Sequence, residues 1–144
     1  MGTMAAFLRR LESPAVQALY DELTETWDRR AAQLNAALAH EELPLRVANL
    51  STIWTVCFKA PSRYNWMLQY YLRAEGLLLS WVGTGRIILS LNYTEQDFAA
   101  VAERFVAAAR AMARDGWWWN DGAITGKSIR RRVLREMLRH YRRS

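Results

Sequence analysis

The apolar residues of this chain change their spacing after His40, and this change restricts the possible folds more than any other feature. From Val16 to Leu38 they recur every three or four positions, which predicts a long amphipathic helix. Ser13-Pro14 is a typical helix start, so we expect this helix over residues 14–40. Over Leu50–Phe58, β-branched and aromatic residues alternate instead, which predicts a strand that is apolar on both sides and lies inside a sheet. Helices packed on a sheet follow from these two patterns.

Shorter patterns complete the expected architecture. Short helices are expected over residues 4–11 and about 64–75. Two apolar runs, residues 77–82 and 86–91, flank a glycine-containing turn and predict a hairpin. Thr94, with an acidic residue three positions on, approximates a capping box for the last helix of the body. The order α-α-β-α-β-β-α, followed by a basic C-terminal helix, predicts an α+β fold with helices on one face of a three-stranded, mostly antiparallel sheet.

The net charge of +6 belongs to the C-terminal tail. Residues 127–144 hold eight basic residues and one acid, so the tail carries +7 and residues 1–126 carry −1. Apolar residues recur every four positions from Ile129 to Tyr141, which predicts an amphipathic helix. Two interpretations stay open. The helix docks its apolar stripe and leaves its arginines in water, or it offers a surface to anionic lipid, nucleic acid or an acidic partner through Arg130, Arg131, Arg132, Arg135 and Arg139.

Several classes of protein are excluded by simple counts. The 144 residues suffice for one domain with a core, and no apolar run approaches the roughly 20 residues of a membrane span. The single cysteine, Cys57, precludes an internal disulfide; we expect it to be buried and the protein to be cytoplasmic. The chain has no phosphate-binding glycine loop, and its two histidines are too far apart in sequence to predict a metal site.

Three features are not explained by packing alone. Arg86 opens a predicted strand after a flexible turn, where its guanidinium is a candidate to bind a substrate carboxylate. Trp117, Trp118 and Trp119 are consecutive, and such large apolar surfaces are expected to bury against the domain or another subunit rather than to stack on nucleic-acid bases. The third feature is a short apolar helix at the N-terminus, with Met4, Phe7, Leu8 and Leu11.

The middle of the chain resembles a known enzyme domain. The segments Leu72–Leu77 and Ser90–Phe98 resemble the C-terminal domain of class III pyridoxal-phosphate aminotransferases. Within it, Ser90, Thr94 and Asp97 match the Ser-x-x-His-Thr-x-x-Asp pattern of the glutamate-1-semialdehyde aminomutase branch, with Tyr93 in place of the histidine. Arg86 instead matches the arginine of the ornithine aminotransferase branch. The resemblance covers residues 1–119; residues 120–126 are expected to be a linker, and the tail lies outside it.

The resemblance implies an incomplete catalytic apparatus. In this family a larger, preceding domain supplies the lysine that binds pyridoxal phosphate, and neither Lys59 nor Lys127 matches that lysine. The chain alone is therefore expected to bind no cofactor and to be inactive, its role being to close the cofactor cleft and help select an amino or keto substrate. Residues 1–12 and the three tryptophans would form the seam to that domain or to a second subunit.

The expected partner is that large domain or a second copy in a dimer, rather than a membrane or a nucleic acid. The alternative is a non-catalytic α+β interaction module whose arginine-rich tail binds nucleic acid or an acidic partner.

Overall fold

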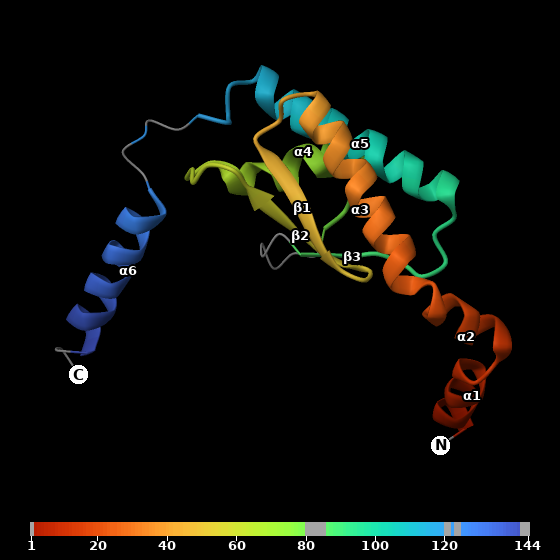
Figure 1. Ribbon diagram of the computed structural model, residues 1–144. Helices are drawn as coiled ribbons and strands as arrows, with labels where there is room; N and C mark the ends of the chain where they lie inside the picture. Colours follow the sequence, from red (N-terminus) through yellow and green to blue (C-terminus); the bar gives the residue numbers. More distant parts are fainter. Residues whose placement is uncertain (1, 80–85, 120–121, 123–124, 142–144) are drawn as a thin grey trace.

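The computed structural model describes residues 2–79, 86–119, 122 and 125–141, and it confirms the α+β fold with a three-stranded antiparallel sheet (Figure 1). In chain order the elements are α1 (Gly2–Leu11), α2 (Pro14–Asp21), α3 (Leu23–His40), β1 (Leu45–Leu50), β2 (Ile53–Phe58), the 3₁₀ turn η1 (Asn65–Met67), α4 (Leu68–Ala74), β3 (Arg86–Ile88), α5 (Glu95–Arg114) and α6 (Gly126–Tyr141).

The sheet has the order β1-β2-β3, so β2 is the interior strand, as its apolar composition predicted. Side chains alternate between the two faces. Leu45 and Val47 of β1 and Trp54 of β2 are buried under the helices, whereas Leu50 and Ile53 are exposed. Helices α3, α4 and α5 lie on one side of the sheet (Figure 1). The opposite side, which we call the open face, is not covered by any described element.

Three aromatic rings form the centre of the core between the sheet and its helices. Trp27 of α3, Trp54 of β2 and Phe98 of α5 meet edge to face, with ring centroids 5.7 to 6.4 Å apart. Leu68 and Leu72 of α4 belong to the same buried cluster. Edge-to-face contacts of this kind stabilise beyond the burial of area, so this trio fixes how α3 and α5 sit on the sheet.

The strand assignment from the sequence was wrong in two places. The first strand, β1, was missed, and the strand expected over residues 50–58 is its hairpin partner β2, shortened at the start. The turn between them uses Ser51 with φ of 53°, a left-handed conformation that glycine usually supplies. No glycine marks this turn, so the short alternation Leu45-Arg46-Val47 before it does not stand out as a separate strand.

The predicted hairpin over residues 77–91 is also corrected. Leu77–Leu79 are not in a strand, residues 80–85 with the Gly-Thr-Gly turn lie outside the described part, and β3 ends at Ile88 rather than residue 91. β3 pairs with β2 instead, antiparallel, with Arg86 opposite Thr55.

The long N-terminal helix is two helices that meet at Glu22. The two helices differ in their packing: α2 buries no residue, whereas α3 buries Trp27, Leu34 and Leu38 among others. At its far end α3 is tied to α5, since Arg110 donates to Glu41 at 2.7 Å. This hydrogen bond holds the pKa of Glu41 below its ordinary value of 4.5.

Candidate functional site

The open face carries two rows of side chains that cross all three strands. Leu50 of β1 faces Ile53 of β2, which faces Ile88 of β3, and these apolar side chains are 77, 44 and 69% exposed. The neighbouring row contains Thr55 and Arg86, again in register. Cross-strand neighbours lie close enough to form one continuous surface. The open face is therefore an apolar row with a guanidinium beside it.

A hollow of about 500 Å³ lies on this surface. Its lining comes from all three strands: Ala48, Asn49, Leu50, Ile53, Trp54, Thr55 and Arg86. No other described side chain forms an ion pair or hydrogen bond with the Arg86 guanidinium, which is exposed. A free guanidinium beside an apolar hollow can bind a carboxylate through two parallel hydrogen bonds while the rest of the ligand contacts the apolar row.

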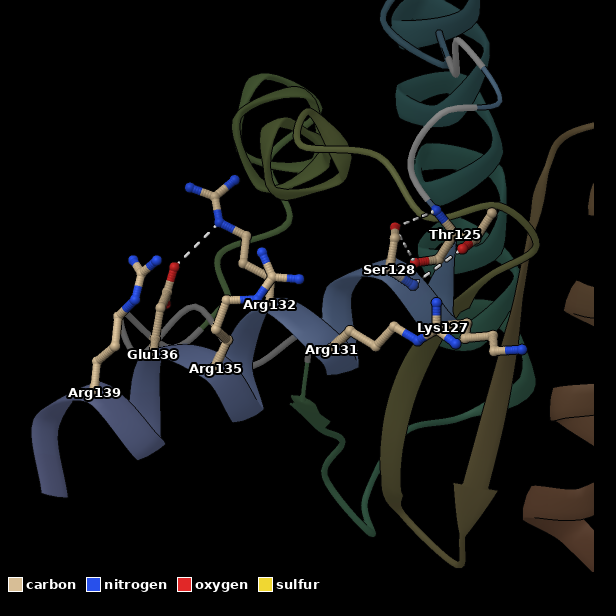
Figure 2. Close-up of a pocket in the computed structure, with 8 residues that line it drawn as sticks. All are labelled: Thr125, Lys127, Ser128, Arg131, Arg132, Arg135, Glu136 and Arg139. Atoms are coloured by element: carbon tan, nitrogen blue, oxygen red, sulfur yellow. Dashed lines mark hydrogen bonds and ion pairs between the residues drawn. The ribbon is translucent and has the colours of Figure 1, made fainter. Parts of the chain in front are cut away.

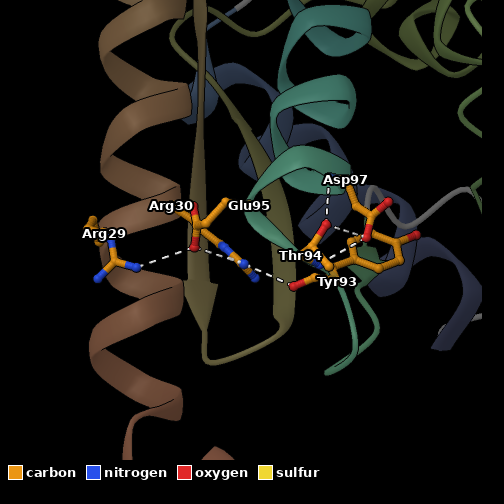
Figure 3. A network of polar contacts seen from close by, with 6 residues as sticks. All are labelled: Arg29, Arg30, Tyr93, Thr94, Glu95 and Asp97. Carbon is orange, nitrogen blue, oxygen red and sulfur yellow. Dashed lines mark hydrogen bonds and ion pairs between the residues drawn. The ribbon is translucent and has the colours of Figure 1, made fainter.

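The residues that carried the family resemblance have structural roles here (Figure 3). Thr94 is the N-cap of α5: its Oγ1 accepts from the Asp97 amide at 3.1 Å, and the Asp97 carboxylate accepts from the Thr94 amide at 2.9 Å. The Ser90 hydroxyl accepts from the Asn92 amide at 3.2 Å. Tyr93, which replaces the histidine of the pattern, uses its carbonyl to accept from Arg30 at 3.0 Å. These contacts shape a turn and start a helix; they do not assemble a reactive site.

The cap also favours the ionised form of the Asp97 carboxylate. Hydrogen bonds, first from the Thr94 amide and then from its hydroxyl, hold the pKa of Asp97 below its ordinary value of 3.8. A carboxylate with a lowered folded pKa stabilises the fold above its ordinary pKa, and this contribution is lost as the pH falls through the folded value.

We predict that Thr94→Ala lowers the free energy of unfolding by about 1 kcal/mol at neutral pH, because the N-cap bond to α5 is lost. Thr94→Ser, which keeps the hydroxyl, is the matched control and should cost much less. Urea unfolding monitored by circular dichroism measures both. The deficit of Thr94→Ala should shrink as the pH falls below 3.8 and through the lower folded pKa of Asp97, because the protonated carboxyl no longer gains from the Thr94 hydroxyl. A deficit that grows in acid would contradict the assignment of this cap.

The most constrained charged residue, Arg30, was missed by sequence reasoning. Its side chain is only 5% exposed, donates at 3.0 Å to both the Tyr93 carbonyl and Glu95, and lies 4.6 Å from the Trp27 ring centroid. Arg29 reaches the same Glu95 carboxylate from the exposed side, at 3.4 Å (Figure 3). Residue 30 lies three positions after Trp27, on the buried side of α3, but the groups that stabilise its charge lie more than 60 residues away in the sequence. Arg30 joins α3 to the start of α5 and is not aimed at the open face.

The three consecutive tryptophans divide between the core and the surface. Trp118 packs against Phe58, with centroids 6.0 Å apart, and donates from Nε1 to the Ala109 carbonyl at 3.1 Å. Trp117 contacts Tyr64 at 5.2 Å. Trp119 is 50% exposed. Two of the three therefore pack on their own domain, and only Trp119 keeps a large free surface.

The N-terminal helix α1 presents the other predicted seam residues. Met4, Phe7 and Leu8 are 65, 58 and 51% exposed, and Leu11 is half-buried. Among the described elements, α1 makes its contacts with α2. Its apolar side chains are thus available to a surface outside the described fold.

The basic residues singled out in the tail lie on α6, which Figure 1 shows apart from β3, the strand that contains Arg86. Arg130, Arg131, Arg132, Arg135 and Arg139 are all exposed. Figure 2 shows Arg131, Arg132, Arg135 and Arg139 with Glu136, which accepts from Arg132 Nε at 3.1 Å. The structure therefore does not join the tail arginines and Arg86 into one site.

The residues present do not fit pyridoxal phosphate. That cofactor needs a lysine for its Schiff base and an acid at its pyridine nitrogen. Lys59, just after β2, and Lys127, in the first turn of α6, are both exposed, and the Arg86 hollow is lined by neither a lysine nor an acid. No cofactor chemistry is therefore assigned to this chain's own residues.

In the described part of the chain, no group of three or more His, Cys, Asp or Glu side chains is placed to hold a metal ion. Cys57, expected to be buried, is instead half-buried, because it alternates onto the open face opposite Arg46. None of the described helices combines the length and the apolar character that crossing a membrane requires.

Comparison with known proteins bears on the fold. No protein-family model and no curated protein matches the chain. Among solved structures, it is similar to one described as "Transaminase with PLP bound", with a TM-score of 0.59 and 20% sequence identity over 74% of this chain. The match spans only 26% of that transaminase. The chain thus has the fold of one part of a transaminase.

Proposed function

We propose that this chain serves as the small C-terminal domain of a pyridoxal-phosphate-dependent transaminase, working with a larger domain in the same or another polypeptide. The observation that carries the proposal is the open face of a transaminase-like sheet, where an apolar row lies beside an exposed arginine that no other described side chain pairs with. In this role the chain closes over the cofactor cleft of the larger domain. The larger domain supplies the lysine that forms the Schiff base with pyridoxal phosphate, a role that neither Lys59 nor Lys127 matches.

The chemistry of the open face supports a role in substrate selection. The Arg86 guanidinium would bind a carboxylate of the amino or keto substrate, as in the ornithine aminotransferase branch. The sequence pattern of Ser90, Thr94 and Asp97 resembles the aminomutase-like branch of class III, whereas Arg86 resembles the ornithine aminotransferase branch. A dimeric, cytoplasmic enzyme is part of the proposal. Because Ser90, Thr94 and Asp97 form a turn and a helix cap, they support a fold like that of the transaminase small domain but do not indicate which substrate is bound.

Docking on a larger domain requires apolar surfaces that are free in the isolated chain. The open-face row and the α1 side chains Met4, Phe7 and Leu8 meet this requirement. Burying an apolar side chain of this size contributes about 1.5–3 kcal/mol, so the open-face row and the α1 side chains together can offset the cost of association. In the absence of the larger domain, we expect a second copy to cover these surfaces.

Sedimentation velocity over a range of concentrations tests this expectation. The full chain should self-associate, and the open-face variant Leu50→Gln/Ile88→Gln should weaken association by roughly 100-fold, given the apolar burial it removes. Phe7→Gln/Leu8→Gln probes α1 in the same way. The control Trp66→Gln/Tyr70→Gln alters exposed aromatic residues of η1 and α4, on the helical side, and should leave association unchanged. A chain that stays monomeric at every concentration would contradict the docking surfaces.

A further inference from the structure

The C-terminal helix α6 has no partner in the described fold. It spans 16 residues and starts at a well-formed cap, where the Ser128 amide donates to Thr125 Oγ1 at 3.1 Å and the Thr125 amide donates to the Ser128 hydroxyl at 2.9 Å. Figure 1 shows it apart from the sheet and its covering helices. Most of the stability of a protein helix comes from packing of its apolar face, so α6 is expected to need a surface that covers this face.

The apolar side of α6 is fully available for such a surface. Its large apolar side chains are 43 to 86% exposed: Ile129, Val133, Leu134, Met137, Leu138 and Tyr141. Because a helix turns once in 3.6 residues, these positions gather on one half of its circumference. Two basic residues also fall on this half: Lys127 lies near its edge, and Arg130 lies near its middle. The long side chain of Arg130 must therefore bend away from the apolar residues to place its charge in a polar layer.

The other half of α6 is a strip of arginines. Arg131, Arg135 and Arg139 are spaced by four residues, with Arg132 beside them (Figure 2). The hollow of about 620 Å³ on this side is lined only by Thr125 and residues of α6 itself, so no other described element covers it.

The charge of this strip is almost uncompensated. Glu136, the one acid of α6, pairs with Arg132. Among the described residues, no ion pair is formed by the other basic side chains of the helix: Lys127, Arg130, Arg131, Arg135 and Arg139. A partner for α6 must therefore be anionic where it meets the arginines and apolar where it meets the opposite half.

We propose that α6 binds the surface of an anionic lipid membrane, lying in the plane of the interface. The apolar half then enters the boundary with the acyl chains while the arginines contact lipid phosphates and other anionic headgroups. A nucleic acid would satisfy only the arginines and leave the apolar half in water. This partner departs from the sequence-based expectation of no membrane contact, which treated the tail mainly as a docked helix.

Flotation of the full chain with lipid vesicles tests the proposal. Vesicles of phosphatidylcholine with phosphatidylserine should bind the chain, and binding should weaken with added salt; vesicles of phosphatidylcholine alone should bind far less. Each arginine near an anionic surface contributes roughly fivefold in affinity, so Arg131→Gln/Arg135→Gln/Arg139→Gln should weaken binding by roughly 100-fold. Val133→Gln/Met137→Gln/Leu138→Gln keeps the charge and should also lose binding, because the apolar half no longer inserts.

The matched control removes three arginines from the body. Arg46, Arg73 and Arg104 are exposed, so Arg46→Gln/Arg73→Gln/Arg104→Gln should bind vesicles like the unmodified chain. Circular dichroism verifies that each variant is folded. Equal binding to neutral vesicles, or full binding by the apolar variant, would overturn the proposal. Binding of RNA or self-association through α6, without vesicle binding, would also overturn it by assigning the helix to that partner.

Discussion

Replacing Trp54 by alanine should lower the free energy of unfolding by about 3–5 kcal/mol, the largest effect expected from any single substitution considered for this chain. Trp54 is 2% exposed and contacts both Trp27 and Phe98, so its removal opens a cavity between the sheet, α3 and α5. It also removes the hydrogen bond from Nε1 to the Ser51 carbonyl, 3.0 Å long, which steadies the turn between β1 and β2. Guanidinium unfolding followed by circular dichroism measures the change.

Two further variants separate the contributions at Trp54. Trp54→Phe keeps most of the ring packing and removes the hydrogen bond, so it should cost clearly less than alanine. Trp66→Ala removes a tryptophan that is 55% exposed and contacts Tyr70 at its edge; it should change stability by only about 0.5 kcal/mol. Similar losses for Trp54→Ala and Trp66→Ala would show that the aromatic trio is not the centre of the core.

Arg30→Met should cost about 2 kcal/mol, the second largest effect. Methionine retains the apolar stem between Trp27 and Phe98 but removes the donors to the Tyr93 carbonyl and to Glu95. Hydrogen bonds from a charged donor contribute about 1.5–3 kcal/mol, and the cation–π contact with Trp27 adds to them. Against this stands the burial of the guanidinium, whose Nε lacks a hydrogen-bond partner among the described residues.

The neighbouring arginine provides the control. Arg29→Met removes a side chain that is 52% exposed and touches the same Glu95 carboxylate at 3.4 Å. Exposed ion pairs contribute about 0–1 kcal/mol and are screened by salt, so this variant should be nearly neutral in high salt. The cost of Arg30→Met should persist there. An Arg30→Met chain as stable as the unmodified one would mean that burial of the charge offsets its hydrogen bonds.

The sequence predicted those elements whose signals are local. α5 was found from its cap and its apolar face, and the interior strand from its apolar residues on both sides. β1 was missed because Ser51 adopts a conformation that glycine normally marks. Arg30 was missed because a charged residue on the buried side of a helix is stabilised by groups more than 60 residues away, which spacing within the helix cannot reveal.

In the candidate site, too, features with a local sequence signal could be predicted, and features that depend on distant residues could not. Arg86 was singled out from its place at the start of a strand, and it does lie on the sheet. The apolar row beside Arg86 depends on the register between three strands, and one of them, β1, was not predicted. The family-like residues Thr94 and Asp97 could be found by their pattern, but only the structure shows that they cap a helix.

The central proposal, that this chain is the small domain of a pyridoxal-phosphate transaminase, is tested most directly by reductive trapping in its native cells. The protein is tagged at its C-terminus, purified under native conditions, reduced with borohydride and analysed by peptide mass spectrometry. We predict a pyridoxyl-modified lysine in a larger domain, in the same polypeptide or in a stoichiometric partner, and none at Lys59 or Lys127. A tagged protein with no pyridoxyl-lysine, or with the modification at Lys59 or Lys127, would contradict the proposal.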